Sequence, residues 1–136
     1  MPRRAHHENH AEPGQRQLRV GEELRHALAQ LLRPGELRDP VLYDANVTVT
    51  EVQVSPDLRN ATAFVMPLGG ANAADILAGL TRGTPFLKGR IARAVRLRLV
   101  PNLTFALDRA FESAERIAAL LASEAVERDL RDKDAD

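Results

Sequence analysis

The sequence predicts an α+β fold in which a three-stranded sheet packs on helices in the order α-β-β-α-α-β, with an additional C-terminal helix. Three observations predict it. Apolar residues recur at helical spacing after Gln15, Val and Thr alternate at strand spacing between Asn46 and Leu68, and helical spacing returns after Gly69-Gly70. The 136 residues suffice for one modest hydrophobic core.

The first helix is expected to begin at Gln15 and to end before Pro34-Gly35, a pair that stops helices. The stretch before it, residues 1–14, is polar and without period, which predicts a disordered tail. The apolar residues recur every three or four positions and define one buried face: Val20, Leu24, Leu28, Leu31 and Leu32.

Two strands are expected to pair as a hairpin. The first spans Asn46 to Ser55, the turn is Ser55-Pro56-Asp57, and the second strand spans Asn60 to Leu68. The Val residues change parity between Val47/Val49 and Val52/Val54. That change indicates either a β-bulge or a strand that is buried on both faces.

A short helix follows the hairpin, with Asn72 as a candidate N-cap, and it breaks at Arg82-Gly83. Thr84 is predicted to cap the next helix, with Pro85 at its first position, where the missing N–H costs nothing. This third helix is expected to run to about Arg96. Its predicted buried stripe follows helical spacing: Leu87, Ile91, Ala94 and Val95.

A third strand is expected over Leu103 to Leu107, and residues 112–130 then form an amphipathic helix. We therefore expect one folded domain over residues 15–122 that includes the C-terminal helix. Residues 123–136 are expected to be an acidic, fraying tail.

The chain is neutral overall, but its charge is unevenly distributed. Residues 1–107 hold 14 Lys and Arg against 10 Asp and Glu, whereas residues 108–136 hold 5 against 9. A basic body indicates a polyanionic partner. The absence of cysteine excludes a disulfide framework, and no apolar run reaches the roughly 20 residues that span a bilayer. A cytoplasmic protein without a membrane segment is expected.

The basic charge gathers in the acid-free run from Ile76 to Leu107. Arginine forks match phosphate geometry, so this run predicts salt-sensitive binding to an RNA backbone. A merely solvated helix face is the alternative. The predicted RNA-binding residues are those of the run, Arg82, Lys88, Arg90, Arg93, Arg96 and Arg98, together with Arg16, Arg19 and Arg25 of the first helix.

Aromatic residues are scarce, and Phe64, Phe86 and Phe105 are all expected in the core. Recognition of unstacked bases on aromatic platforms is therefore not expected, and recognition of RNA shape and backbone fits better. No motif predicts a cofactor or an enzyme active site. His6, His7 and His10 could hold a metal ion, but a polar tail without fixed geometry is the favoured interpretation.

Three stretches resemble the ribosome-binding factor A family: VTVTEVQVSPDLRNATAFV, FLKGRIARAVRLRLVPNLTFALD and FESAERIAALL. The element order with its basic helix pair also resembles a KH domain of the type II arrangement. The resemblance covers roughly residues 15–122. That family has an Ala-x-Gly kink between the two helices, where this chain reads Gly83-Thr84-Pro85. A helix–kink–helix is expected to survive this departure.

The resemblance implies a KH-like RNA-binding domain that acts in small-subunit assembly. Such proteins bind free or immature 30S subunits, contact 16S rRNA and assist its late maturation, including 5′-end processing. In some bacteria an assembly GTPase helps to release them. They are not enzymes and need no cofactor, and we expect a monomer. A protein–protein adaptor that uses the C-terminal helix and acidic tail remains the alternative.

Overall fold

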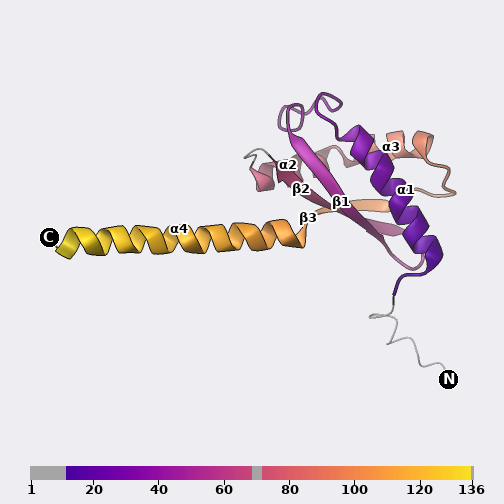
Figure 1. Ribbon diagram of the computed structural model, residues 1–136. Coiled ribbons are helices and arrows are strands. Elements are labelled where there is room, and N and C mark those ends of the chain that lie inside the picture. The colour runs from indigo at the N-terminus through magenta and orange to yellow at the C-terminus, as the bar shows by residue number, and fades with distance from the viewer. Residues whose placement is uncertain (1–11, 69–71, 136) are drawn as a thin grey trace, which may run out of the picture. The chain divides into compact units, whose positions relative to one another are not determined.

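The computed structural model describes residues 12–68 and 72–135, with the predicted order α-β-β-α-α-β followed by a further helix (Figure 1). The chain divides into two compact units, residues 1–106 and 107–136. The elements are α1 (Gln15–Leu31), β1 (Asn46–Val54), β2 (Asn60–Leu68), α2 (Ala73–Arg82), α3 (Thr84–Ala94), β3 (Asn102–Leu107) and α4 (Arg109–Ala135). The predicted fold class is confirmed.

The three strands form one sheet in the order β1-β2-β3, and β1 and β2 are antiparallel. The register shifts between Val49 and Glu51, so Thr50 is an extra residue in β1. Thr50 Oγ1 donates to the Phe64 carbonyl at 3.3 Å. Of the two interpretations of the valine parity change, the β-bulge is therefore correct.

Helix α1 lies very close to β1, and a glycine permits this approach. A Cβ built on Gly21 would lie 2.6 Å from the Val52 carbonyl oxygen, closer than a side chain can sit. The Gln17 side chain fixes the start of the helix, because its Nε2 donates to the Val54 carbonyl at 2.8 Å. The small side chains of Ala61 and Ala63 are buried on the central strand.

The core joins one face of the sheet to three helices. From the helices it takes Val20, Leu24, Leu28, Ile76, Leu80, Leu87 and Ile91, and from the sheet Val49, Val52, Val54, Val65, Leu103 and Phe105. Helices α1 and α3 therefore each keep one face free for solvent or a partner.

Helix α3 ends earlier than predicted. Its last residue is Ala94, and Val95 adopts an extended conformation with φ −121° and ψ 132°. The chain leaves the helix there to reach β3, so Ala94 is exposed and Val95 is only half-buried. Arg96 therefore lies in an irregular segment beyond the helix.

The second unit contains α4, one continuous helix from Arg109 to Ala135. The Asp108 carboxylate accepts from the Ala110 N–H at 2.9 Å at the start of this helix. Acidic residues stand four positions before basic ones, as in Glu112 and Arg116, a spacing that favours helix. The predicted boundary between residues 122 and 123 thus falls inside a continuous helix. Within the described residues, no helix is long and apolar enough to cross a membrane.

Candidate nucleic-acid interface

Five arginines from three separate segments surround one groove of about 560 Å³. We call it the arginine groove. Its basic residues are Arg16 and Arg19 from α1, Arg59 from the hairpin turn, and Arg96 and Arg98 from the segment after α3. The other residues that line it are Val20, Glu23, Asp57, Leu58, Leu97, Leu99 and Pro101. Five cations against two carboxylates give the groove an excess of positive charge, which suits phosphate groups.

The hairpin turn reaches the groove because the start of β3 lies beside it. The Asn102 N–H donates to the Arg59 carbonyl at 2.8 Å, which brings the turn next to the segment that contains Arg96. Leu58 in this turn has a positive φ of 62°, which is uncommon for a residue other than glycine. Two backbone hydrogen bonds hold the turn in this shape: the Leu58 N–H donates to the Ser55 carbonyl and the Ser55 N–H donates to the Asn60 carbonyl, both at 2.8 Å.

Asp57, one of the two groove carboxylates, is occupied by the turn itself. Its Oδ1 accepts from the Ser55 hydroxyl at 2.7 Å and from the Arg59 N–H at 3.0 Å. The Ser55 hydrogen bond, followed by that from Arg59, lowers the pKa of the Asp57 carboxyl. Asp57 thus acts mainly as a turn residue.

Arg59 was missed by the sequence interpretation, which took its candidate residues from the first helix and from the acid-free run between Ile76 and Leu107. Arg59 is flanked by Asp57 and lies outside the acid-free run, so its local charge pattern gives no signal. The hydrogen bond to Asn102, 43 positions further along the chain, is what brings it to the groove. A tertiary contact of this kind has no local sequence signature.

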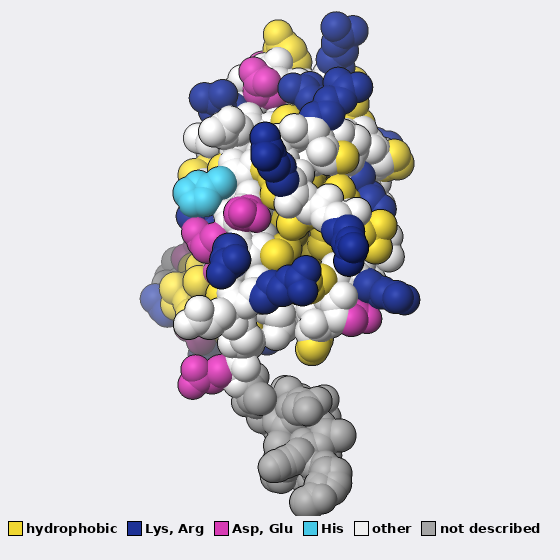
Figure 2. All heavy atoms as spheres, turned by 90° about the vertical axis from the view of Figure 1, so that its right-hand side faces the viewer, with side chains coloured by type: hydrophobic (Ala, Val, Ile, Leu, Met, Phe, Trp, Pro, Cys, Tyr) yellow, Lys and Arg dark blue, Asp and Glu magenta, His cyan; other side chains and the backbone are white. Residues whose placement is uncertain are grey.

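Smaller hollows continue the groove along the seam between α1 and α3. One is lined by Glu23, His26 and Arg96 and the next by Gln30, Arg90 and Arg93, and neighbouring hollows share lining residues. Figure 2 shows the side of the molecule on which α1 and α3 lie, with Lys and Arg side chains spread over most of it and fewer Asp and Glu. We call this surface, which includes the arginine groove and the two smaller hollows, the α1–α3 face.

Two of the predicted RNA-binding arginines are paired with carboxylates of the protein. Arg25 makes a two-pronged contact with Glu22, with both distances at 2.9 Å. This hydrogen bond lowers the pKa of the Glu22 carboxyl and raises that of the Arg25 guanidinium. Arg25 must therefore release the Glu22 carboxylate before its guanidinium can bind a phosphate.

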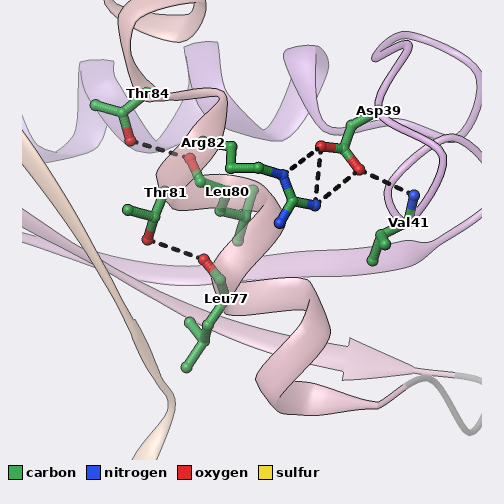
Figure 3. A network of polar contacts seen from close by, with 7 residues as sticks. All are labelled: Asp39, Val41, Leu77, Leu80, Thr81, Arg82 and Thr84. Atoms are coloured by element: carbon green, nitrogen blue, oxygen red, sulfur yellow. Dashed lines mark hydrogen bonds and ion pairs between the residues drawn. The ribbon is translucent and has the colours of Figure 1, made fainter.

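Arg82 is the second paired arginine, and it joins α2 to the loop that follows α1 (Figure 3). Its Nη2 lies 3.0 Å from Oδ2 of Asp39, and Nε donates to the same oxygen at 3.1 Å. Asp39 also accepts from the Val41 N–H at 2.9 Å. That backbone hydrogen bond, and then the contact with Arg82, lower the pKa of the Asp39 carboxyl.

Lys88 lies on a different part of α3. It is half-buried, and its Nζ donates to Oδ1 of Asn102 at 3.3 Å, so it connects α3 to the start of β3. Arg90 and Arg93 are exposed on the side that faces α1. The structure therefore brings six of the nine predicted cations to the groove and hollows of the α1–α3 face: Arg16, Arg19, Arg90, Arg93, Arg96 and Arg98. Arg25, Arg82 and Lys88 have partners within the protein.

The kink between α2 and α3 is present, but its cap differs from the prediction. Gly83 both ends α2, through a bond from its N–H to Gly79 O at 3.0 Å, and begins α3, by accepting from Leu87 N at 2.9 Å. Thr84 is the first residue of α3, and its hydroxyl donates back to Leu80 O at 3.0 Å (Figure 3). Because that hydroxyl is engaged with α2, the residue does not cap α3. Pro85 is accommodated in the first turn of α3.

The expectation that the three Phe residues are core is correct for Phe105 and wrong for Phe86. Phe105 is 8% exposed, Phe64 is half-buried, and Phe86 is 50% exposed. Phe86 sits in the first turn of α3, where the chain has just changed direction, and its ring faces outward beside the kink. Leu87, the next residue along α3, takes the buried position instead and is 0% exposed.

A family model for ribosome-binding factor A matches residues 16–121. The chain belongs to the ribosome-binding factor A family. It is 58% identical over 118 residues to the family member of Paramagnetospirillum magneticum, covering 87% of this chain and 83% of that one. It is 50% identical over 130 residues to that of Nitrobacter winogradskyi, covering 96% and 95%.

Solved structures of the family agree with this fold. The crystal structure of ribosome-binding factor A from Thermus thermophilus matches with a TM-score of 0.58 and 28% identity, over 67% of this chain and 94% of that one. A homology model of the Thermus thermophilus family member, fitted into a cryo-EM map of its complex with the 30S subunit, matches with a TM-score of 0.54 and 31% identity, over 65% and 91%.

The described residues contain no group of three or more metal-ligating side chains. The three N-terminal histidines that were weighed as a metal site, His6, His7 and His10, lie outside the described part of the chain.

Proposed function

We propose that this protein binds the free small ribosomal subunit through 16S rRNA and that the α1–α3 face is the contact surface. The observation that carries the proposal is the arginine groove, where five cations from three segments meet around one hollow. Each phosphate that an arginine neutralises releases counterions, which gives affinity that falls steeply with salt. The family and the 30S complex of the Thermus thermophilus relative support the same partner.

The direct test is co-sedimentation with purified small subunits, large subunits and intact ribosomes at several salt concentrations. We expect association with free small subunits only, and we expect it to weaken as salt rises. Equal binding to all three particles would show a nonspecific polycation effect. No association at low salt would contradict the proposal.

The finer part of the proposal concerns late assembly. We infer from the family resemblance that the protein acts on immature 30S particles, assists maturation of the 16S rRNA 5′ end and leaves with the help of an assembly GTPase. A strain without the protein is then expected to accumulate 16S precursors with extended 5′ ends, as read by primer extension. Normal 5′ ends at every growth temperature would contradict this part alone.

A protein–protein adaptor is the second candidate, and α4 is the observation that favours it. This helix exposes several large apolar side chains, including Ile117, Leu120 and Leu121. The two candidates differ in which change abolishes function. Replacing Arg90 and Arg93 by Gln impairs an RNA-binding factor, whereas truncation before residue 109 impairs an adaptor and leaves RNA binding intact.

A further inference from the structure

We propose that a pocket beside the kink binds one unpaired base of an RNA strand, with Phe86 as the stacking platform. The inference rests on the proposed function and adds to it a contact with a base, where the arginine groove contacts the backbone. The kink pocket has a volume of about 480 Å³. That volume lies within the range of about 300–1,000 Å³ found for small-molecule sites. Its walls include Leu37, Leu42 and Gly83.

Phe86 is exposed and lies next to an arginine, and a residue that stacks on a base needs both features. Half of its surface is open to solvent, although it is a large apolar side chain. The guanidinium of Arg90, one helical turn later, lies 5.6 Å from the ring centroid. Aromatic rings beside arginine are the usual platforms for single-stranded nucleic acid, because a base stacks on the ring while the cation meets a flanking phosphate.

The charge of the kink pocket suits a base better than a phosphate. Arg38 and Arg90 are balanced there by Glu36 and Asp39, so the pocket has no net charge. A phosphate therefore gains little attraction in this pocket, whereas a flat, uncharged base can bury its faces against apolar walls.

The pocket also connects to the surface that is proposed to follow the RNA backbone. Arg90 lines both the kink pocket and the hollow that contains Arg93 and Gln30. An RNA strand that follows the arginines along the α1–α3 face thus passes Phe86 at the kink. The exposed Glu36 carboxylate can accept a hydrogen bond from an exocyclic amino group, which adenine carries and uracil lacks.

The test uses the full-length protein and a short oligoadenylate with one 2-aminopurine, whose fluorescence reports stacking. Phe86→Leu is expected to weaken binding about five- to a hundred-fold and to abolish the fluorescence change. Phe86→Trp keeps an aromatic face and is expected to retain both. Binding of an RNA duplex of matching length is expected to stay unchanged in both variants, because its bases are already paired and stacked.

Two controls separate this inference from the proposed function. Thermal unfolding is used to check that Phe86→Leu is folded. We expect that it is, because the Phe86 ring is half exposed in the wild type. Arg16→Gln with Arg98→Gln is measured on the same RNAs and on small subunits. If that variant loses affinity while Phe86→Leu binds oligoadenylate with wild-type affinity and fluorescence, the stacking site is overturned and the proposed function stands. If wild type binds the oligoadenylate in a Phe86-dependent way but ignores small subunits, only the proposed function fails.

Discussion

The arginine groove and the kink pocket lie at opposite ends of the seam between α1 and α3 and differ in the chemistry of their walls. The groove has five cations against two carboxylates, whereas the pocket has two of each and a half-exposed phenylalanine. The same face thus offers long-range attraction at one end and close apolar contact at the other. Attraction between exposed charges is screened by salt, and stacking is not.

Charge reversal in the arginine groove is expected to have the largest effect. Arg16→Glu with Arg98→Glu replaces two attractions by two repulsions, and we expect affinity for small subunits to fall roughly a hundred-fold or more at low salt. Fluorescence anisotropy with labelled protein measures it. The matched control is Arg116→Glu with Arg128→Glu on α4, which makes the same charge change in the second unit. Equal losses in the two variants would show that only net charge matters.

A second prediction compares two glycines, one near each end of the face. Gly21→Ala places a methyl group 2.6 Å from the Val52 carbonyl oxygen, so α1 must move away from β1. We expect the free energy of unfolding to fall by about 1–3 kcal/mol.

Gly83→Ala is the matched control at the kink. Its φ is −85°, and the new Cβ meets Gly79 O at 3.5 Å, an ordinary contact. We expect unchanged stability or a gain of about 0.4–1 kcal/mol, because alanine restricts the unfolded chain. Urea unfolding of both variants gives the comparison. A larger loss for Gly83→Ala than for Gly21→Ala would contradict the described packing.

A third prediction ranks single arginines by whether the protein already pairs them. Arg93→Gln removes an exposed cation on the α1–α3 face. Arg25→Gln removes a cation that is already paired with the Glu22 carboxylate. We expect Arg93→Gln to reduce small-subunit affinity several-fold and Arg25→Gln to reduce it less. Titrations at one fixed salt concentration decide the order. The reverse order would mean that RNA displaces Glu22 and that Arg25 is a principal contact.

The smallest expected effect is a pH dependence from the three carboxyls with lowered pKa values, Glu22 on α1, Asp57 at the groove and Asp39 at the pocket. A pKa that is lower in the folded state gives stability that is present above the unfolded value of about 3.9 and is lost as pH falls through the folded value. We therefore expect unfolding free energy to decline only below about pH 4, and to decline less steeply in Asp39→Asn. An identical decline in that variant would rule out Asp39 as a contributor.

Local patterns in the sequence were sufficient to predict most of the fold. The periodicity of α1, the parity change that marks the bulge at Thr50, and the break at Gly83 each depend on residues close together in the chain. The end of α3 was misplaced because Val95 continues the apolar spacing while its backbone is already extended. The length of α4 was underestimated because an acidic composition was taken as a sign of fraying.

The candidate site was predicted less completely, because it depends on contacts between distant segments. The acid-free run drew attention to the basic side chains of α3, but the pairing of Arg82 with Asp39 spans 43 positions. The contribution of Arg59 and the exposure of Phe86 likewise follow from how the hairpin turn and α2 pack against their neighbours. The sequence shows which charged side chains are present, but only the tertiary structure shows which of them are exposed and unpaired on one surface.

The salt dependence of small-subunit affinity tests most directly whether the arginine groove binds the rRNA backbone. Wild type and Arg16→Gln with Arg98→Gln are titrated against purified small subunits, and the logarithm of the association constant is plotted against the logarithm of the salt concentration. We predict a steep negative slope for wild type and a slope shallower by about one to two in the variant, since two phosphate contacts are lost. Identical slopes would contradict the groove as the site of backbone contact.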